Sequence, residues 1–181
     1  MKATGIVRRI DELGRIVIPK EIRRHYKIRE GTPLEIFSGN SGELVLKKYS
    51  PVLELEDVSN DACKSVFDVI ETNTFICDKD IIISCEGKNN FKKNYLHKNI
   101  SLDLEKVIEN RKAVILNSKE GATLIPIFKE QQIDFTSLVI IPILANGDTY
   151  GAIVIVGENN FTNNEVKILQ TFGNFINLQI S

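Results

Sequence analysis

Short runs of alternating or β-branched apolar residues, broken by turn residues, mark the first fifty positions of the chain. Because side chains alternate between the two faces of a strand, such runs predict strands rather than helices. The predicted strands cover residues 6–10, 15–18, 34–37 and 44–47. A turn at 11–14 separates the first two, and Pro19 suits the start of a short helix that runs from Lys20 to Tyr26.

Longer helical stripes and apolar strands share the rest of the chain. The predicted helices cover residues 53–72, 102–110 and 163–180. The predicted strands cover residues 75–77, 81–85, 113–116, 138–143 and 152–156. Thr162 and Glu165 form a capping box for the last helix, and Asn146-Gly147 favours a tight antiparallel hairpin. This order predicts the α+β class, with an antiparallel sheet between flanking helices.

The net charge of the chain changes sign at the same position at which its hydrophobic pattern changes. Residues 1–50 carry eleven Lys and Arg against six Asp and Glu, a net charge of +5, whereas residues 51–181 have a net charge of −6. Pro51 disfavours helix at the residue before it and marks the boundary. We therefore predict one domain over 1–50 and another over 51–181. A basic domain on an acidic chain indicates a polyanionic partner.

The N-terminal segment is too small to fold on apolar burial alone. Its fifty residues contain about a dozen large apolar side chains, without a disulfide or a metal-ligand pattern to stabilise them. Two hairpins of this size leave apolar faces and strand edges uncovered. We therefore predict that two copies of the segment share one core.

Five arginines lie within seventeen positions of this segment: Arg8, Arg9, Arg15, Arg23 and Arg24. The planar guanidinium group suits phosphate oxygens and the N7/O6 edge of guanine. Arg8 and Arg15 lie on predicted strands joined by one turn, so we expect them near each other, and a dimer would double the set into a surface for double-stranded DNA. The alternative is a solvated surface on which Arg8 pairs with Asp11 or Glu12.

The run Met1–Pro19, of which Asp11–Pro19 is the specific part, and the run Glu21–Arg24 resemble the AbrB family of swapped-hairpin transition-state regulators. The resemblance continues through residues 34–37 and 46–51. It implies a dimeric, interleaved β-barrel that binds DNA. It also implies DNA contacts by Arg8, Arg15, Arg23 and Arg24, with Arg9 at a basic position of the family.

The hairpin over residues 141–155 resembles that of GAF domains, a family of small-molecule sensors. An AbrB-like domain followed by a GAF-like domain resembles regulators of gene expression in the developing spore. The resemblance is weakest over 86–135, where the loops of a ligand pocket would lie, so no ligand-binding residue is predicted. The ligand, the preferred DNA sequence and the choice between activation and repression stay open.

The closing helix carries more apolar surface than one sheet requires. Its apolar residues are Val166, Ile168, Leu169, Phe172, Phe175, Ile176, Leu178 and Ile180. The excess predicts packing on another subunit, so that dimeric heads joined through such domains form a dimer of dimers. The alternative is a helix that is buried within its own subunit.

Catalytic and metal-binding patterns are missing from the sequence. His25 and His97 lie in different domains, and Cys63, Cys77 and Cys85 form no CxxC pair. We therefore expect buried, reduced thiols and no enzyme, metal or cofactor. No apolar run approaches the ~20 residues of a membrane span, so we expect a cytoplasmic protein that associates with the nucleoid.

An antitoxin is the alternative function, because swapped-hairpin domains also occur in antitoxins. An antitoxin usually carries a disordered tail that wraps its toxin. Residues 51–181 are instead apolar and periodic, which is typical of a folded domain. The sequence therefore favours a DNA-binding transcription regulator.

Overall fold

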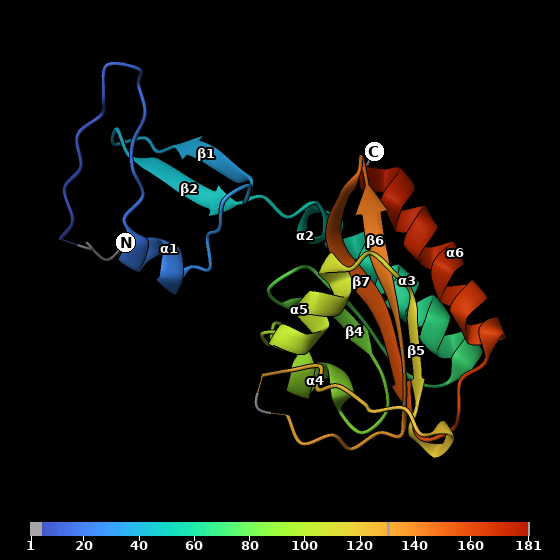
Figure 1. The fold of residues 1–181 in the computed structure, drawn as a ribbon. Helices are drawn as coiled ribbons and strands as arrows, with labels where there is room; N and C mark the ends of the chain where they lie inside the picture. Colours follow the sequence, from blue (N-terminus) through green and yellow to red (C-terminus); the bar gives the residue numbers. More distant parts are fainter. Residues whose placement is uncertain (1–4, 130, 181) are drawn as a thin grey trace. The chain divides into compact units, whose positions relative to one another are not determined.

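The computed structural model describes residues 5–129 and 131–180 of the chain. The described residues divide into two units, one within Met1–Tyr49 and the other within Ser50–Ser181 (Figure 1). We call these units the head and the body and describe each by itself. Across the described ranges, no helix combines the length and the apolar character that a bilayer span needs.

The head contains one short helix and one hairpin. Helix α1 (Lys20–His25) follows Pro19, which occupies the N-cap position. Strands β1 (Leu34–Ser38) and β2 (Leu44–Lys48) pair in antiparallel fashion. The predicted helix and the last two predicted strands of the head are therefore confirmed.

The first two predicted strands of the head do not form in the single chain. Residues 6–10 and 15–18 are extended arms outside any sheet, on either side of a turn in which the Gly14 N–H donates to the Asp11 carbonyl over 3.0 Å. The pattern shows that these residues suit a strand, but it does not show which chain supplies the neighbouring strand. The prediction is wrong here because a strand needs a partner for its backbone groups.

The head buries almost none of its apolar side chains. Across residues 5–49, only Pro19 is buried. Large apolar side chains are exposed on both arms and on the hairpin, among them Val7, Ile10, Val17, Ile36 and Leu44. A single head therefore lacks the apolar core that stabilises a domain.

A five-stranded antiparallel sheet forms the centre of the body (Figure 1). Its strands are β3 (Asn73–Cys77), β4 (Ile82–Glu86), β5 (Val114–Asn117), β6 (Ser137–Ala145) and β7 (Asp148–Gly157), in the order β4-β3-β7-β6-β5. Asn146 and Gly147 join β6 to β7, and both have positive φ, as the tightest hairpin turns require. The predicted strands of the body and this turn are confirmed, with β6 and β7 longer than predicted.

Helices cover both faces of the sheet. They are α2 (Pro51–Glu54), α3 (Glu56–Ile70), α4 (Phe91–Tyr95), α5 (Leu102–Glu109) and α6 (Asn163–Ile180), with a short 3-10 turn η1 (Ser118–Glu120). Helices α2, α3 and α6 pack on one face, whereas α4, α5 and residues 124–128 and 135 pack on the other (Figure 1). This arrangement confirms the predicted α+β class.

The helix predicted over residues 53–72 is in fact two helices. Ser50 caps α2, since its Oγ accepts from the Leu53 N–H over 3.3 Å, and Pro51 starts the helix. Leu55 then departs from helical geometry, with φ −96° and ψ 31°, and α3 begins at the next residue. Val52 and Leu55 still pack on the sheet. The stripe of apolar residues therefore continues through the break, and the sequence pattern does not reveal where the helix is interrupted.

The predicted capping box of α6 is confirmed. The backbone N–H and the hydroxyl of Thr162 both donate to Glu165 Oε2 over 2.7 Å, and the Asn164 N–H donates to Thr162 Oγ1 over 3.2 Å. Partial burial alone would raise the pKa of Glu165. Its pKa is nevertheless lowered, because the hydrogen bonds from Thr162 favour the carboxylate.

Thr162→Ala should lower the free energy of unfolding of the body by about 1 kcal/mol, because the start of α6 loses its cap. The lowered pKa of Glu165 means that its share of this stability is present above the unfolded value of about 4.3 and is lost as the pH falls through the folded value. Urea unfolding at neutral and falling pH measures both effects. Thr171→Ala is the control, since that hydroxyl donates only to the Lys167 carbonyl of the same helix. An equal loss in the control would contradict the prediction.

Candidate nucleic-acid interface

All five arginines predicted to meet DNA are exposed on the head. Arg8 and Arg9 belong to the first arm, Arg15 begins the second arm, and Arg23 and Arg24 lie in α1. Among the described residues, Arg15 alone of the five forms an ion pair. Four guanidinium groups are therefore available to an external anion.

Asp11 organises the turn between the two arms. Its Oδ1 accepts from the backbone N–H groups of Leu13 and Arg15 over 3.0 and 2.8 Å, and its Oδ2 pairs with Arg15 Nε over 2.8 Å. The hydrogen bonds from the backbone and side chain of Arg15 lower the pKa of Asp11, so the pair is charged at neutral pH.

Sequence reasoning placed Asp11 in the turn and considered its side chain as a partner for Arg8, but it missed this role. In the structure Arg8 instead donates to the Val7 carbonyl over 3.0 Å. The signal that identifies the role is an aspartate at the first position of a turn, where its side chain accepts from the backbone that follows. These hydrogen bonds fix the backbone of the turn and therefore the position of Arg15 at its end.

The two arginines of α1 differ in their contacts. Arg23 Nε donates to the Ile18 carbonyl over 3.2 Å and so holds α1 against the end of the second arm. The Arg24 side chain makes no hydrogen bond within the described residues and is exposed to solvent. Neighbouring helical residues point about 100° apart, so the two side chains leave the helix in different directions.

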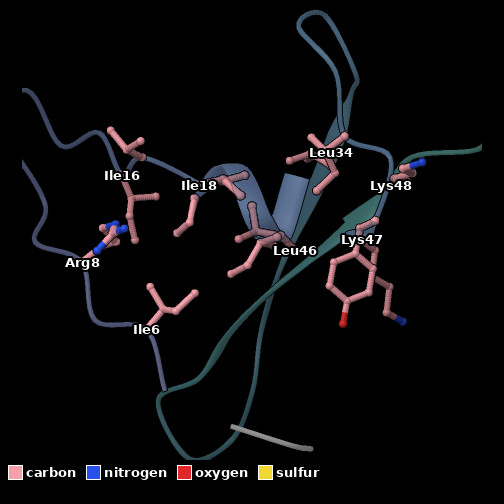
Figure 2. Close-up of a pocket in the computed structure, with 13 residues that line it drawn as sticks. Ile6, Arg8, Ile16, Ile18, Leu34, Leu46, Lys47 and Lys48 are labelled. Carbon is pink, nitrogen blue, oxygen red and sulfur yellow. The ribbon is translucent and has the colours of Figure 1, made fainter. Parts of the chain in front are cut away.

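An apolar hollow of about 570 Å³ opens in the head, between the arms, α1 and the hairpin (Figure 2). Ile6, Ile18 and Leu46 point toward one another across it (Figure 2). Arg8 and Lys47 add cationic groups to the same lining. The hollow therefore joins the uncovered apolar surface of the head to part of its basic surface.

In the body, aromatic side chains fill the space between the sheet and α4. Tyr95 stacks on Phe128 with ring centroids 4.4 Å apart, Phe91 lies 4.7 Å from Tyr95, and Phe75 lies 6.1 Å from Phe128. Burial, with a smaller effect from the charge of Asp134, raises the pKa of Tyr95, so its hydroxyl is neutral. The cluster is packed on itself, and no ligand-binding residue can be assigned within it.

The three cysteines are buried and free, as predicted. Burial raises the pKa of Cys63 to about 12 and that of Cys85 to about 11, and it raises the pKa of Cys77 further. The thiols are therefore protonated and act as small packing groups. Within the ranges that the structure covers, no group of three His, Cys, Asp or Glu residues is placed to hold a metal ion.

Two family models match the chain, one in each part. Residues 54–181 match the C-terminal domain of stage V sporulation protein T, described as a transcription factor. Residues 7–54 match the family described as antidote-toxin recognition MazE, a bacterial antitoxin. The second match covers the arms, α1 and the hairpin of the head.

Curated relatives match the whole chain or its N-terminal half. Stage V sporulation protein T of Bacillus subtilis (strain 168) is 44% identical over 182 residues, which cover 99% of both chains. The transition state regulatory protein AbrB of the same organism is 40% identical over 87 residues, which cover 48% of this chain and 81% of that protein.

Solved structures share the fold of the body. The GAF domain of an Acinetobacter phosphoenolpyruvate-protein phosphotransferase matches with a TM-score of 0.54 and 16% identity, covering 70% of this chain and 81% of that one. Residues 122–287 of a methyl-accepting chemotaxis protein match with a TM-score of 0.59 and 13% identity, covering 71% and 89%. At these identities the likeness shows the GAF-like fold alone.

The fold and these matches define a transcription regulator in which an AbrB-like swapped-hairpin domain precedes a GAF-like domain. The predicted α+β architecture and the prediction of a regulator rather than an enzyme are confirmed. The chain belongs to the family of stage V sporulation protein T.

Proposed function

We propose that this chain regulates transcription during spore development by binding double-stranded DNA through the arginines of its head. Residues 1–50 serve as the DNA-binding domain, and residues 51–181 serve as the oligomerisation and sensor domain. The DNA-contacting residues are Arg8, Arg9, Arg15, Arg23 and Arg24. The proposal is carried by one observation: four of these exposed guanidinium groups lack a carboxylate partner within the described head. A protein with this role acts in the cytoplasm, on the nucleoid.

A second copy of the head supplies the core that one copy lacks. Ile16 and Leu46 are 53% and 44% exposed on the lining of the hollow, and covering such surface stabilises by about 25 cal/mol per Å². The arms of one head then pair with the partner's backbone and become the strands that the sequence pattern predicts. The two-fold axis of the dimer matches the two-fold geometry of a DNA duplex.

Exposed apolar groups on α3 and α6 support a second interface between copies of the chain. Val69, Phe175 and Leu178 are 66%, 48% and 73% exposed, although α6 already buries Leu169 and Ile176 against the sheet. Helices α3 and α6 lie on the same face of the body (Figure 1). We therefore propose that bodies pair through these helices and join two dimeric heads into a tetramer.

We also propose that the body senses a small molecule. The support for this sensing is the GAF-like fold of the body, together with the resemblance of the hairpin over residues 141–155 to that of small-molecule sensors. A ligand that entered between the sheet and α4 would have to displace Tyr95 or Phe128 from their stack. Binding would then shift the body toward the state in which those rings have moved.

The antitoxin remains the second candidate, because the head matches an antitoxin family over residues 7–54. An antitoxin of this type needs a segment that wraps a toxin. The chain after the head instead folds into a sheet with two apolar clusters, and it matches a transcription factor family over residues 54–181. These observations favour the regulator.

The proposed DNA binding should weaken steeply with salt, because neutralised phosphates release counterions that salt drives back. With six or more phosphate contacts, affinity should fall about a thousandfold between roughly 50 and 200 mM salt. Fluorescence anisotropy of the full chain on a labelled promoter duplex measures this. A flat salt profile would argue against arginine–phosphate contacts, and a small toxin that co-purifies with a chain unable to bind DNA would favour the antitoxin.

A further inference from the structure

The body is acidic overall but concentrates positive charge in one segment. Between Gly87 and Leu102 the sequence contains four lysines and one histidine and no carboxylate, in a region whose net charge over 51–181 is −6. The lysines are Lys88, Lys92, Lys93 and Lys98, and all four are exposed. We call these four residues the lysine surface.

The fold holds the lysine surface outward. Phe91 is buried and Tyr95 stacks on Phe128, so α4 is fixed to the body by these two rings. The remaining side chains of this short helix, including Lys92 and Lys93, therefore face solvent. Lys98 adds to the same surface, since its Nζ lies 4.9 Å from the centroid of the Tyr95 ring.

Neighbouring carboxylates do not neutralise this surface. Asp103 pairs with Lys106 over 3.0 Å, and Glu86 Oε1 accepts from the Gly87 N–H over 3.3 Å. The charge of Asp134 contributes to the raised pKa of Tyr95, but Asp134 forms no ion pair in the part of the chain that the structure describes. Within the described residues, none of the four lysines has a carboxylate at ion-pair distance. The charge is therefore available to an external anion.

We propose that the lysine surface is a second DNA-contacting surface, which binds phosphates of the duplex next to the segment held by the head. This inference rests on the DNA binding proposed above. The head and the body are consecutive in the chain, with the division between Tyr49 and Ser50, so a bound head keeps the body close to the duplex. An acidic body is repelled by DNA unless it presents a basic surface, and the lysine surface is such a surface.

DNA explains this surface better than an acidic protein partner does. Protein interfaces depend on a few buried aromatic or aliphatic anchors. From residue 87 to 101, no large apolar side chain is exposed. Lysine is a flexible point charge that suits phosphate contacts without reading sequence.

The test compares two triple variants of the full chain. The lysine-surface variant carries Lys88→Gln, Lys92→Gln and Lys93→Gln, which remove three positive charges from the lysine surface. Lys98 is kept, because its Nζ lies over the Tyr95 ring. The matched control carries Arg111→Gln, Lys112→Gln and Lys119→Gln, which are exposed positions outside α3, α4 and α6 and change the net charge equally. Thermal unfolding shows whether each variant is folded, and the corresponding triple Lys→Arg variant restores charge at the lysine surface.

Affinity is measured on a duplex of about 20 bp, two helical turns, and on one of about 50 bp. On the long duplex, the lysine-surface variant should bind roughly tenfold more weakly, with a salt slope shallower by about 0.9 for each lost phosphate contact. The control and the Lys→Arg variant should bind like the unaltered chain, and on the short duplex all should agree.

Equal loss in both triple variants would reduce the effect to net charge, and unchanged binding on the long duplex would overturn the inference. Arg24→Ala is measured in parallel. If Arg24→Ala weakens binding while the lysine-surface variant does not, only the second surface is refuted. If the unaltered chain itself binds neither duplex, the proposed function fails with it.

Discussion

The Arg23→Ala, Arg24→Ala double variant should lose at least about thirtyfold in affinity for duplex DNA. Each arginine that contacts a base or phosphate contributes about 1–3 kcal/mol, and about 1.4 kcal/mol corresponds to a factor of ten. Both residues lie on the exposed side of α1, and neither forms an ion pair in the described head that would have to break first. Binding is measured by anisotropy at one fixed salt concentration.

The single variants separate binding from structure. Arg23 Nε donates to the Ile18 carbonyl, so Arg23→Ala also loosens the junction of α1 with the second arm. Arg24 has no such contact, so Arg24→Ala removes a guanidinium group and leaves the head intact. Lys112→Ala, Lys119→Ala is the control, because it removes the same charge from exposed positions of the body outside α3 and α6. Full affinity in Arg24→Ala would remove α1 from the proposed interface.

Local sequence signals determined most of the body correctly. The Asn146-Gly147 turn and the apolar runs beside it identified the long β6–β7 hairpin, and Thr162 with Glu165 identified the start of α6. These features depend on residues close together in sequence, which a pattern can reveal. The break at Leu55 was missed because it leaves the apolar stripe unchanged.

In the head, the sequence pattern alone does not predict the whole of the observed structure. Residues 6–10 and 15–18 have the composition of strands but form none in one chain, because their partner strands are not supplied within it. The arginines were predicted by their density and by the AbrB resemblance, and the structure exposes all five. What the pattern missed is the Asp11–Arg15 pair, which depends on the three-dimensional path of the turn.

Two substitutions should divide the proposed tetramer in two different ways. Leu46→Asp places a carboxylate in the apolar hollow of the head, and Phe175→Asp places one on the exposed face of α6. An unpaired charge buried at an interface costs about 3–5 kcal/mol, so each interface should weaken by at least about a hundredfold. Sedimentation velocity of each full-length variant should give dimers, held through the bodies in the first case and through the heads in the second.

The variant that combines both substitutions tests whether the tetramer has two independent interfaces or one. If head and body pair separately, Leu46→Asp with Phe175→Asp should sediment as a monomer, because each substitution removes the contact that the other leaves. Asn40→Asp and Asn164→Asp are the controls, since they add the same charges at exposed positions of the β1–β2 loop and the start of α6, and they should stay tetrameric. A tetramer that survives Leu46→Asp would show that the hollow is not covered by a second head.

The Phe175→Asp dimer should still bind DNA, because its two heads form one arginine surface, whereas the Leu46→Asp dimer should lose binding together with its shared core.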